Sequence, residues 1–268
     1  MKRTVSHINS ALRGLRPGLT ILVFVWILSC VPGFATNCNA ADGVSAISPD
    51  QRRQLKSLVI DIVGKTRRER NELRQARNDL RQYYRSYNVD ERRVKVVLEK
   101  INKCQLTLLN LHLDNQIAVR RILTESQFPE FQDRVNKRMG HRKMEFAFGD
   151  ESFFSRFPGF DVLNSIGISP DQIKKIQASL CWPQRKKLIE KLRQDSCQLL
   201  DINSQYNLNI ATARKLISSI HNSQHAIALI NYKSQLHLRS ILNQGQFERL
   251  RDKIPKRFRD YPRRDRRY

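Results

Sequence analysis

The sequence predicts an all-α protein built from two tandem copies of one helical-hairpin unit, and three observations support this fold class. Apolar residues recur at alternating intervals of three and four positions over long stretches, which is typical of paired amphipathic helices. One pentapeptide occurs twice, far apart in the chain. Glycine and proline gather in a connector near the middle, so that two long helical regions remain on either side of it.

The pentapeptide Ile-Ser-Pro-Asp-Gln stands at 47–51 and again at 168–172, an offset of 121 residues. Tyr-Asn at 87–88 and 206–207, and Ile-Leu-x-x-x-Gln-Phe at 122–128 and 241–247, repeat at an offset of 119 residues. One two-residue insertion or deletion reconciles the offsets, so we interpret the chain as a duplication. The predicted organisation is a signal peptide at 1–35, an N-terminal linker at 36–46, a first helical unit at 47–139, a Phe-rich linker at 140–167, a second helical unit at 168–257 and a basic tail at 258–268.

The first 35 residues resemble an export signal. Residues 1–18 carry four basic and no acidic side chains, and the apolar run that follows at 19–31 is shorter than the roughly 20 residues of a membrane-spanning helix. We expect cleavage after Ala35 and a periplasmic location. Two alternatives remain open, retention of the segment as a membrane anchor and lipidation at Cys30, and both still export the rest of the chain.

The exported part is strongly basic. Cleavage removes four of the 49 Lys and Arg and none of the 25 Asp and Glu, which leaves a net charge of +20. In a cytosolic protein this charge would favour nucleic acid as the partner. Because the chain is expected to be exported, we instead expect acidic proteins, unfolded chains or an anionic membrane surface as partners, and no nucleic acid. Four cysteines, Cys38, Cys104, Cys181 and Cys197, remain in an oxidising compartment, where we expect at most one disulfide and cannot choose among three pairings.

Each unit is predicted to contain a long helix, a tight turn, a second long helix and a short third helix. In the first unit the turn follows Tyr87, and Asp90 is the expected N-cap of the second helix; Asn209 has that place in the second unit. Gly64 and Pro183 interrupt the two first helices at corresponding heights, so we expect both hairpins to bend there. The six phenylalanines at 146–160 are expected to pack onto the hairpins, or alternatively to form an exposed aromatic patch.

Four short segments have the pattern of a helix N-cap with a glutamine three residues later, in which the cap side chain and the glutamine each bond the other's backbone amide. The residues alone therefore predict helix starts rather than chemistry. The paired positions are Ser48 with Gln51, Thr124 with Gln127, Ser169 with Gln172, and Asn243 with Gln246.

The segment Leu123-Thr124-Glu125-Ser126-Gln127 is a complete Leu-Thr-x-x-Gln motif, and segments 47–51, 168–172 and Leu242 to Gln246 are partial copies. By these motifs the chain resembles the Spy/CpxP (LTXXQ-motif) family of periplasmic stress proteins. The resemblance implies bowed helical hairpins that pair as an antiparallel homodimer, here either between chains or within one chain as a pseudo-dimer. It also implies an ATP-independent chaperone or envelope-stress modulator whose partners are unfolded periplasmic proteins or the periplasmic domain of a sensor kinase.

The basic residues of the two first helices are the predicted partner-binding site, because guanidinium groups stack on rings and long stems cover apolar area. The residues are Arg67, Arg68, Arg70, Arg74, Arg77 and Arg81 in the first unit, and Arg185, Lys186, Lys187, Lys191 and Arg193 in the second.

A periplasmic metal-binding or metal-sensing protein is the alternative function, since related branches of the family bind zinc, nickel or cobalt. His221 and His225 stand four residues apart on one helical face and could hold zinc or nickel if a third ligand converged on them. If Ile220 and Ser223 face the partner helix, both imidazoles point to solvent, whereas His237 falls on the apolar seam and is expected to be packed. The sequence contains no phosphate-binding loop, nucleophile elbow or HExxH motif, so we expect no enzymatic activity and no resident cofactor.

Overall fold

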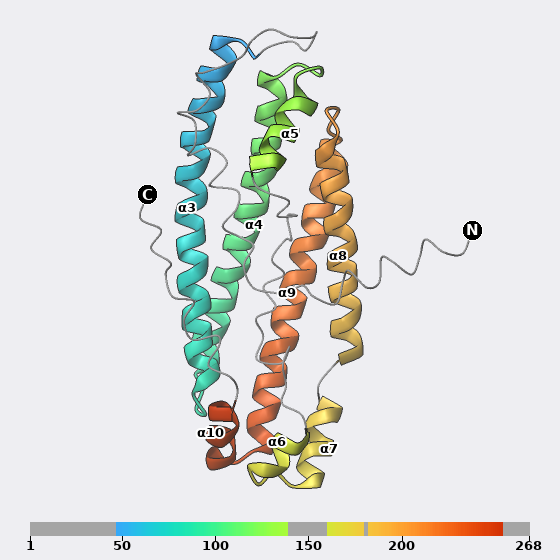
Figure 1. Ribbon diagram of the computed structural model, residues 1–268. Coiled ribbons are helices and arrows are strands. Elements are labelled where there is room, and N and C mark those ends of the chain that lie inside the picture. Colours follow the sequence, from blue (N-terminus) through green and yellow to red (C-terminus); the bar gives the residue numbers. More distant parts are fainter. Residues whose placement is uncertain (1–46, 139–159, 180–181, 254–268) are drawn as a thin grey trace, which may run out of the picture.

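The computed structural model describes residues 47–138, 160–179 and 182–253, which form eight helices and no strands (Figure 1). The predicted all-α fold class is therefore confirmed for these residues. No helix among them is both long enough and apolar enough to cross a bilayer. The expected signal peptide, the N-terminal linker, most of the Phe-rich linker with five of its six phenylalanines, and the basic tail lie outside the described residues.

The first half contains α3 (Pro49–Arg85), α4 (Glu91–Ile122) and α5 (Phe128–Arg138). The starts of α3 and α4 are those predicted, whereas α5 begins at Phe128, three residues after the start expected behind Thr124, and the Gln127 amide bonds the Thr124 carbonyl rather than its hydroxyl. Ser48 accepts a hydrogen bond from the Gln51 amide while the Gln51 side chain accepts one from the Ser48 amide, and Asp90 caps α4. However, α3 runs through Gly64 without a break, because glycine weakens a helix but keeps its backbone N–H donor.

The second half contains α6 (Phe160–Ser165), α7 (Pro170–Ser179), α8 (Trp182–Ser204), α9 (Ile210–Ile241) and α10 (Gln244–Lys253). Asn209 caps α9 as expected. Here two helices, α7 and α8, stand where the first half has α3 alone, and residues 180–181 between them lie outside the described residues. Pro183 is the second residue of α8, a position where the missing N–H breaks no bond within the helix.

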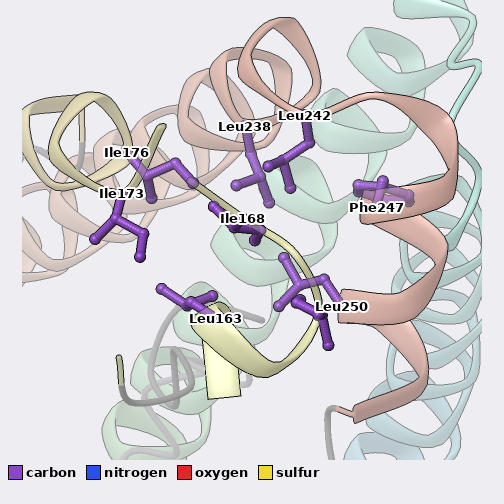
Figure 2. Close-up of a cluster of buried hydrophobic side chains, with 9 residues drawn as sticks. Leu163, Ile168, Ile173, Ile176, Leu238, Leu242, Phe247 and Leu250 are labelled. Atoms are coloured by element: carbon purple, nitrogen blue, oxygen red, sulfur yellow. The ribbon is translucent and has the colours of Figure 1, made fainter. Parts of the chain in front are cut away.

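Helix α6 lies within the segment predicted as a linker, and it is part of the second half's core. Gly167 has a φ of 76°, and the amides of Gly167 and Ile168 bond back to Asn164 and Leu163, which closes the helix in a Schellman arrangement. Figure 2 shows the side chains of α6, α7, α9 and α10 gathered into one apolar cluster. Leu163, Ile168, Phe247 and Leu250 are at most 3% exposed. The second half thus begins several residues before the boundary expected at 168.

The four long helices lie side by side in the order α3, α4, α9, α8, and the contact between α4 and α9 joins the two halves (Figure 1). Each central helix therefore buries two stripes rather than one. In α4, Ile101 and Cys104 pack with α3, while Leu109 and Leu113 pack with α8 and α9. The second stripe lies beside the apolar positions that predicted the hairpin. It was not expected from the sequence, because a two-helix hairpin gives each helix only one neighbour.

Candidate functional site

Two corners of the molecule bring the capping motifs together in pairs. At the first corner the Gln51 side chain donates to the Gln127 carboxamide oxygen at 2.9 Å and to the Ile122 carbonyl at 2.8 Å, while Gln127 donates back to Gln51 at 3.1 Å. Each glutamine oxygen also accepts from its own cap amide, that of Ser48 or Thr124. Only a carboxamide can donate and accept in this way, which explains glutamine at the last motif position.

The second corner repeats this network. Gln172 donates to the carbonyl of Ile241 at 2.8 Å, Gln172 and Gln246 exchange two bonds of 3.1 Å, and Gln246 also donates to the Gly167 carbonyl at 2.7 Å. The motif residues are therefore cross-links between the start of one helix and the end of another. Four of the motif side chains are buried, which indicates a structural role: Leu123, Leu242, Gln127 and Gln246.

Beside each corner lies a contact that joins the two halves, and we call these contacts the latches. In the first latch, Arg120 lies over the Phe128 ring with its guanidinium carbon 4.4 Å from the centroid, and Tyr206 packs edge-on against Phe128 at 5.7 Å. The Tyr206 hydroxyl donates to the Leu123 carbonyl at 3.0 Å. Tyr206 lies in the hairpin tip of the second half, so this tip is held by the first half.

The second latch is built from the equivalent residues with the roles of the two halves exchanged. Its arginine and phenylalanine come from the second half, and its tyrosine comes from the first half. Arg239 lies over Phe247 at 4.6 Å, and Tyr87, in the hairpin tip of the first half, packs edge-on against Phe247 at 5.7 Å. The Tyr87 hydroxyl donates to the Leu242 carbonyl at 3.0 Å. Each half therefore holds the tip of the other.

The latch arginines cap helix ends. Arg120 donates to the carbonyls of Asn203, Gln205 and Tyr206 at the C-terminal end of α8, at distances of 2.7 to 3.1 Å. A cation at this end complements the partial negative charge of the helix terminus. Burial lowers the pKa of Arg120 to about 10, still above neutral pH, so the group remains charged.

Arg239 has the corresponding role at the end of α3. It donates to the carbonyls of Tyr84 and Ser86 at 3.0 and 2.9 Å, and burial likewise lowers its pKa to about 10.

The charged side chains of α3 are separated onto two flanks. Its five carboxylates are Asp50, Asp61, Glu69, Glu72 and Asp79, and none lies on the flank defined by Arg67, Arg70, Arg74, Arg77 and Arg81, which recur every three or four residues. We call this flank the basic flank. The opposite flank is tied to the neighbouring helix through Glu72 and Lys100, whose charged atoms are 4.0 Å apart, and it also holds an ion pair between Lys65 and Asp61 at 2.8 Å. Arg68, expected with the other arginines, lies on this mixed flank.

Arg70 is a half-buried member of this flank. Its Nε and Nη1 atoms are buried and have no hydrogen-bond partner in the described part of the chain, and burial lowers its pKa. Arg67 and Arg74, one turn away on each side, are exposed. Buried polar atoms without partners are rare in proteins, so this arginine is a candidate contact for an acceptor from outside the fold.

The basic residues predicted on α8 do not form an equivalent flank. Positions 119 residues after Arg67, Arg70, Arg74, Arg77 and Arg81 hold Lys186, Ile189, Arg193, Ser196 and Leu200, so only two are basic. Of the other predicted residues, Arg185 is 7% exposed and donates to Asn231 at 3.3 Å, so its place in an exposed site is wrong. Lys187 and Lys191 occupy positions equivalent to Arg68 and Glu72, and Lys191 bonds Asp195 and Ser219. Lys186, Lys187, Lys191 and Arg193 are thus exposed on α8 without forming a row like the basic flank.

The candidate metal ligands lie between the halves. His221 and His225 are half-buried on α9, and the His221 Nε2 atom is 3.2 Å from the Asn102 carbonyl of α4. The expectation that both point to solvent is wrong for His221, which meets α4, and His225 is half-buried rather than fully exposed. His237, expected in the seam, is exposed. Within the described ranges no three His, Cys, Asp or Glu side chains converge as a metal site would require.

Two of the four cysteines are described. Cys104 is buried between α3 and α4, Cys197 is exposed on α8, and both are free thiols. Cys38 and Cys181 lie outside the described residues.

The latch residues and the charge separation were missed by the sequence reasoning. The 119-residue offset carried a signal for the latches, since it also relates Arg120 to Arg239, but hydrophobic periodicity does not report contacts between residues more than 80 positions apart. No family model, no curated protein and no solved structure matches the chain.

Proposed function

We propose that this chain is an exported, ATP-independent and non-enzymatic binding protein of the Spy/CpxP kind, which holds unfolded or acidic periplasmic proteins on the basic flank of α3. The charge separation on α3 is the observation that carries the proposal. A helix that only needed solubility would mix its charges around the exposed surface, whereas here the acidic residues are confined to the side that meets Lys100 of α4.

The exposed part of the flank suits weak and reversible contacts with many sequences. Arg67 and Arg74 are seven residues apart, which places them about 10 Å from each other along the helix. Carboxylates on a flexible chain can reach such a pair without adopting one fixed structure, and Ile60, 65% exposed, adds an apolar contact on the same helix. Arg70 between them offers buried donors whose bonds to a carboxylate are strengthened by the low local dielectric.

The second part of the proposal is that the two halves pair within one chain in the way that two subunits pair in a dimer. The reciprocal latches support it, because each takes its arginine and phenylalanine from one half and its tyrosine from the other. On this proposal the monomer is sufficient for activity.

The test is suppression of aggregation of a chemically denatured client, followed by light scattering with the protein from Thr36 onward. The variant Arg67→Gln/Arg74→Gln removes two charges from the basic flank. The control Lys65→Gln/Arg68→Gln removes two from the mixed flank of the same helix. We expect wild type and control to suppress aggregation at equal ratios, the flank variant to need at least about threefold more protein, and about 0.5 M salt to weaken all three.

Equal loss in both variants would show that net charge, rather than this flank, matters. No suppression by the wild-type protein at any ratio would refute the chaperone function.

A further inference from the structure

The interface between α4 and α9 relates equivalent positions of the two halves. At its centre the His221 imidazole approaches the Asn102 carbonyl, and these two positions are 119 residues apart, the offset of the repeat. A residue that contacts its own equivalent lies on the local axis that relates the halves. Any pair of side chains on one side of this point therefore has a counterpart pair on the other side, and the two can be compared.

The first such comparison is between Glu91 and Tyr232. The Tyr232 side chain is 5% exposed, and its hydroxyl donates to the Glu91 carboxylate at 3.1 Å across the interface. The counterpart positions, 119 residues away, are Ile210 and Leu113, and neither can make a hydrogen bond through its side chain. One end of the interface is thus polar and aromatic, and the other is aliphatic.

The second comparison is between His112 and Asn203. The Asn203 amide nitrogen is 3.1 Å from His112 Nε2, again across the two halves. Burial and the nearby charge of Arg120 lower the pKa of His112 to about 4, so the ring is neutral and accepts this bond. The counterpart positions hold Asn231 and Tyr84. Asn231 accepts instead from Arg185 of its own half.

We infer that the two halves have become specific for each other, so that the first half pairs with the second half and not with another copy of itself. The inference rests on the proposed pairing of the halves. If two second halves paired, each buried Tyr232 hydroxyl would face an isoleucine. If two first halves paired, each His112 would face a tyrosine in place of Asn203. Two second halves would lose the bond of Tyr232 twice, because the axis repeats the mismatch, and a buried polar group without its partner is unfavourable. Two first halves would twice have to fit a tyrosine ring into the space that the smaller Asn203 fills, which is also unfavourable.

The experiment uses the complete chain with a protease site placed within 140–158 and cut after folding, so that both halves are in their native partnership at the start. The cut protein is loosened in mild urea, returned to buffer and analysed by native mass spectrometry. We expect only complexes of one first half with one second half, with like pairs at least on the order of 100-fold less abundant.

The variant Glu91→Ile/Tyr232→Leu replaces the polar pair by the residues found at the counterpart positions, Ile210 and Leu113. The two ends of the interface then carry the same two residue types. It removes the buried hydroxyl that opposes pairing of two second halves, so we expect such pairs to appear, while pairs of first halves remain scarce. Glu91→Gln keeps an acceptor for the Tyr232 hydroxyl and is the control, with the wild-type distribution expected.

A statistical mixture of like and unlike pairs from the wild-type protein would overturn the inference but leave the pairing of the halves intact. Cut halves that separate and never recombine, although each remains helical, would instead refute the pairing itself. Both results come from the wild-type sequence and so do not depend on the folding of a variant.

Discussion

Removal of the Arg120 guanidinium tests whether the latches hold the two halves together. Arg120→Met keeps an unbranched side chain against the Phe128 ring but removes the guanidinium donors to the end of α8, while the Gln132 side chain still donates to the Asn203 carbonyl. Three carbonyls of the second half lose a bond to a charged donor, and the contact with the ring loses its cationic part.

The expected loss follows from these contacts. A hydrogen bond to a charged group contributes about 1.5 to 3 kcal/mol, but carbonyls at a helix end regain water when the donor leaves, and the protein no longer has to bury a cation. We therefore expect the free energy of unfolding to fall by about 2 to 3 kcal/mol, which for a protein of this size lowers the Tm by about 4 to 10 °C.

Urea and thermal unfolding followed by circular dichroism at 222 nm measure this change. Arg121→Met is the matched control, since Arg121 is the adjacent residue of α4 and is exposed; its effect should stay within about 0.5 kcal/mol. Arg239→Met should match Arg120→Met, because its contacts are equivalent. A loss at Arg120 no larger than that at Arg121 would refute the role of the latch.

Three further predictions concern single positions. Gln127→Glu should destabilise the protein by about 2 kcal/mol in urea unfolding, since a buried carboxylate cannot donate to Gln51, whereas Gln54→Glu on the exposed face of α3 should be neutral. Gly64→Ala should stabilise the protein by about 0.5 to 1 kcal/mol, because Gly64 lies within a helix and nothing is near the added Cβ. Gly167→Ala should destabilise it by about 1 kcal/mol, because the φ of Gly167 is positive. A shift of the Tm in the same direction for both variants would contradict this. His112 has a folded pKa of about 4, below the ordinary value near 6.5, so the unfolded chain binds the proton first and stability falls as pH drops from about 6.5 to 4. His112→Asn should remove up to about 3 kcal/mol of the acid-induced loss measured between pH 7 and pH 4.5, and an unchanged pH profile would exclude this cause.

Local signals predicted the helices well, because each start is determined by a few neighbouring residues. Ser48, Asp90 and Asn209 each cap the helix whose start the sequence predicted. The effect of Gly64 was overestimated, since a glycine within a long helix that packs along its whole length is tolerated.

Long-range features were predicted less well. The burial of Arg185 and the partial burial of His221 follow from contacts with α9 and α4 that a seam of period 3.5 does not describe. The charge separation on α3 is a property of angular position around the helix, and a list of basic residues in sequence order does not show it. For this reason Arg68 was grouped with arginines from which it is separated in space.

The reciprocal latches also constrain the order in which the chain can fold as it is synthesised. The first latch, at Arg120, forms only when the hairpin tip at 203–206 has been made. The second latch, at Tyr87, forms only when Arg239 and Phe247 have been made. An N-terminal fragment can form the hairpin of α3 and α4, but its end at Arg120 remains open until residues 203–206 have been made, and its tip at Tyr87 remains open until α10 has been made. The final step therefore depends on contacts across more than 80 residues and comes late, so chains truncated before about residue 247 should have helical content without the cooperative unfolding of the complete protein.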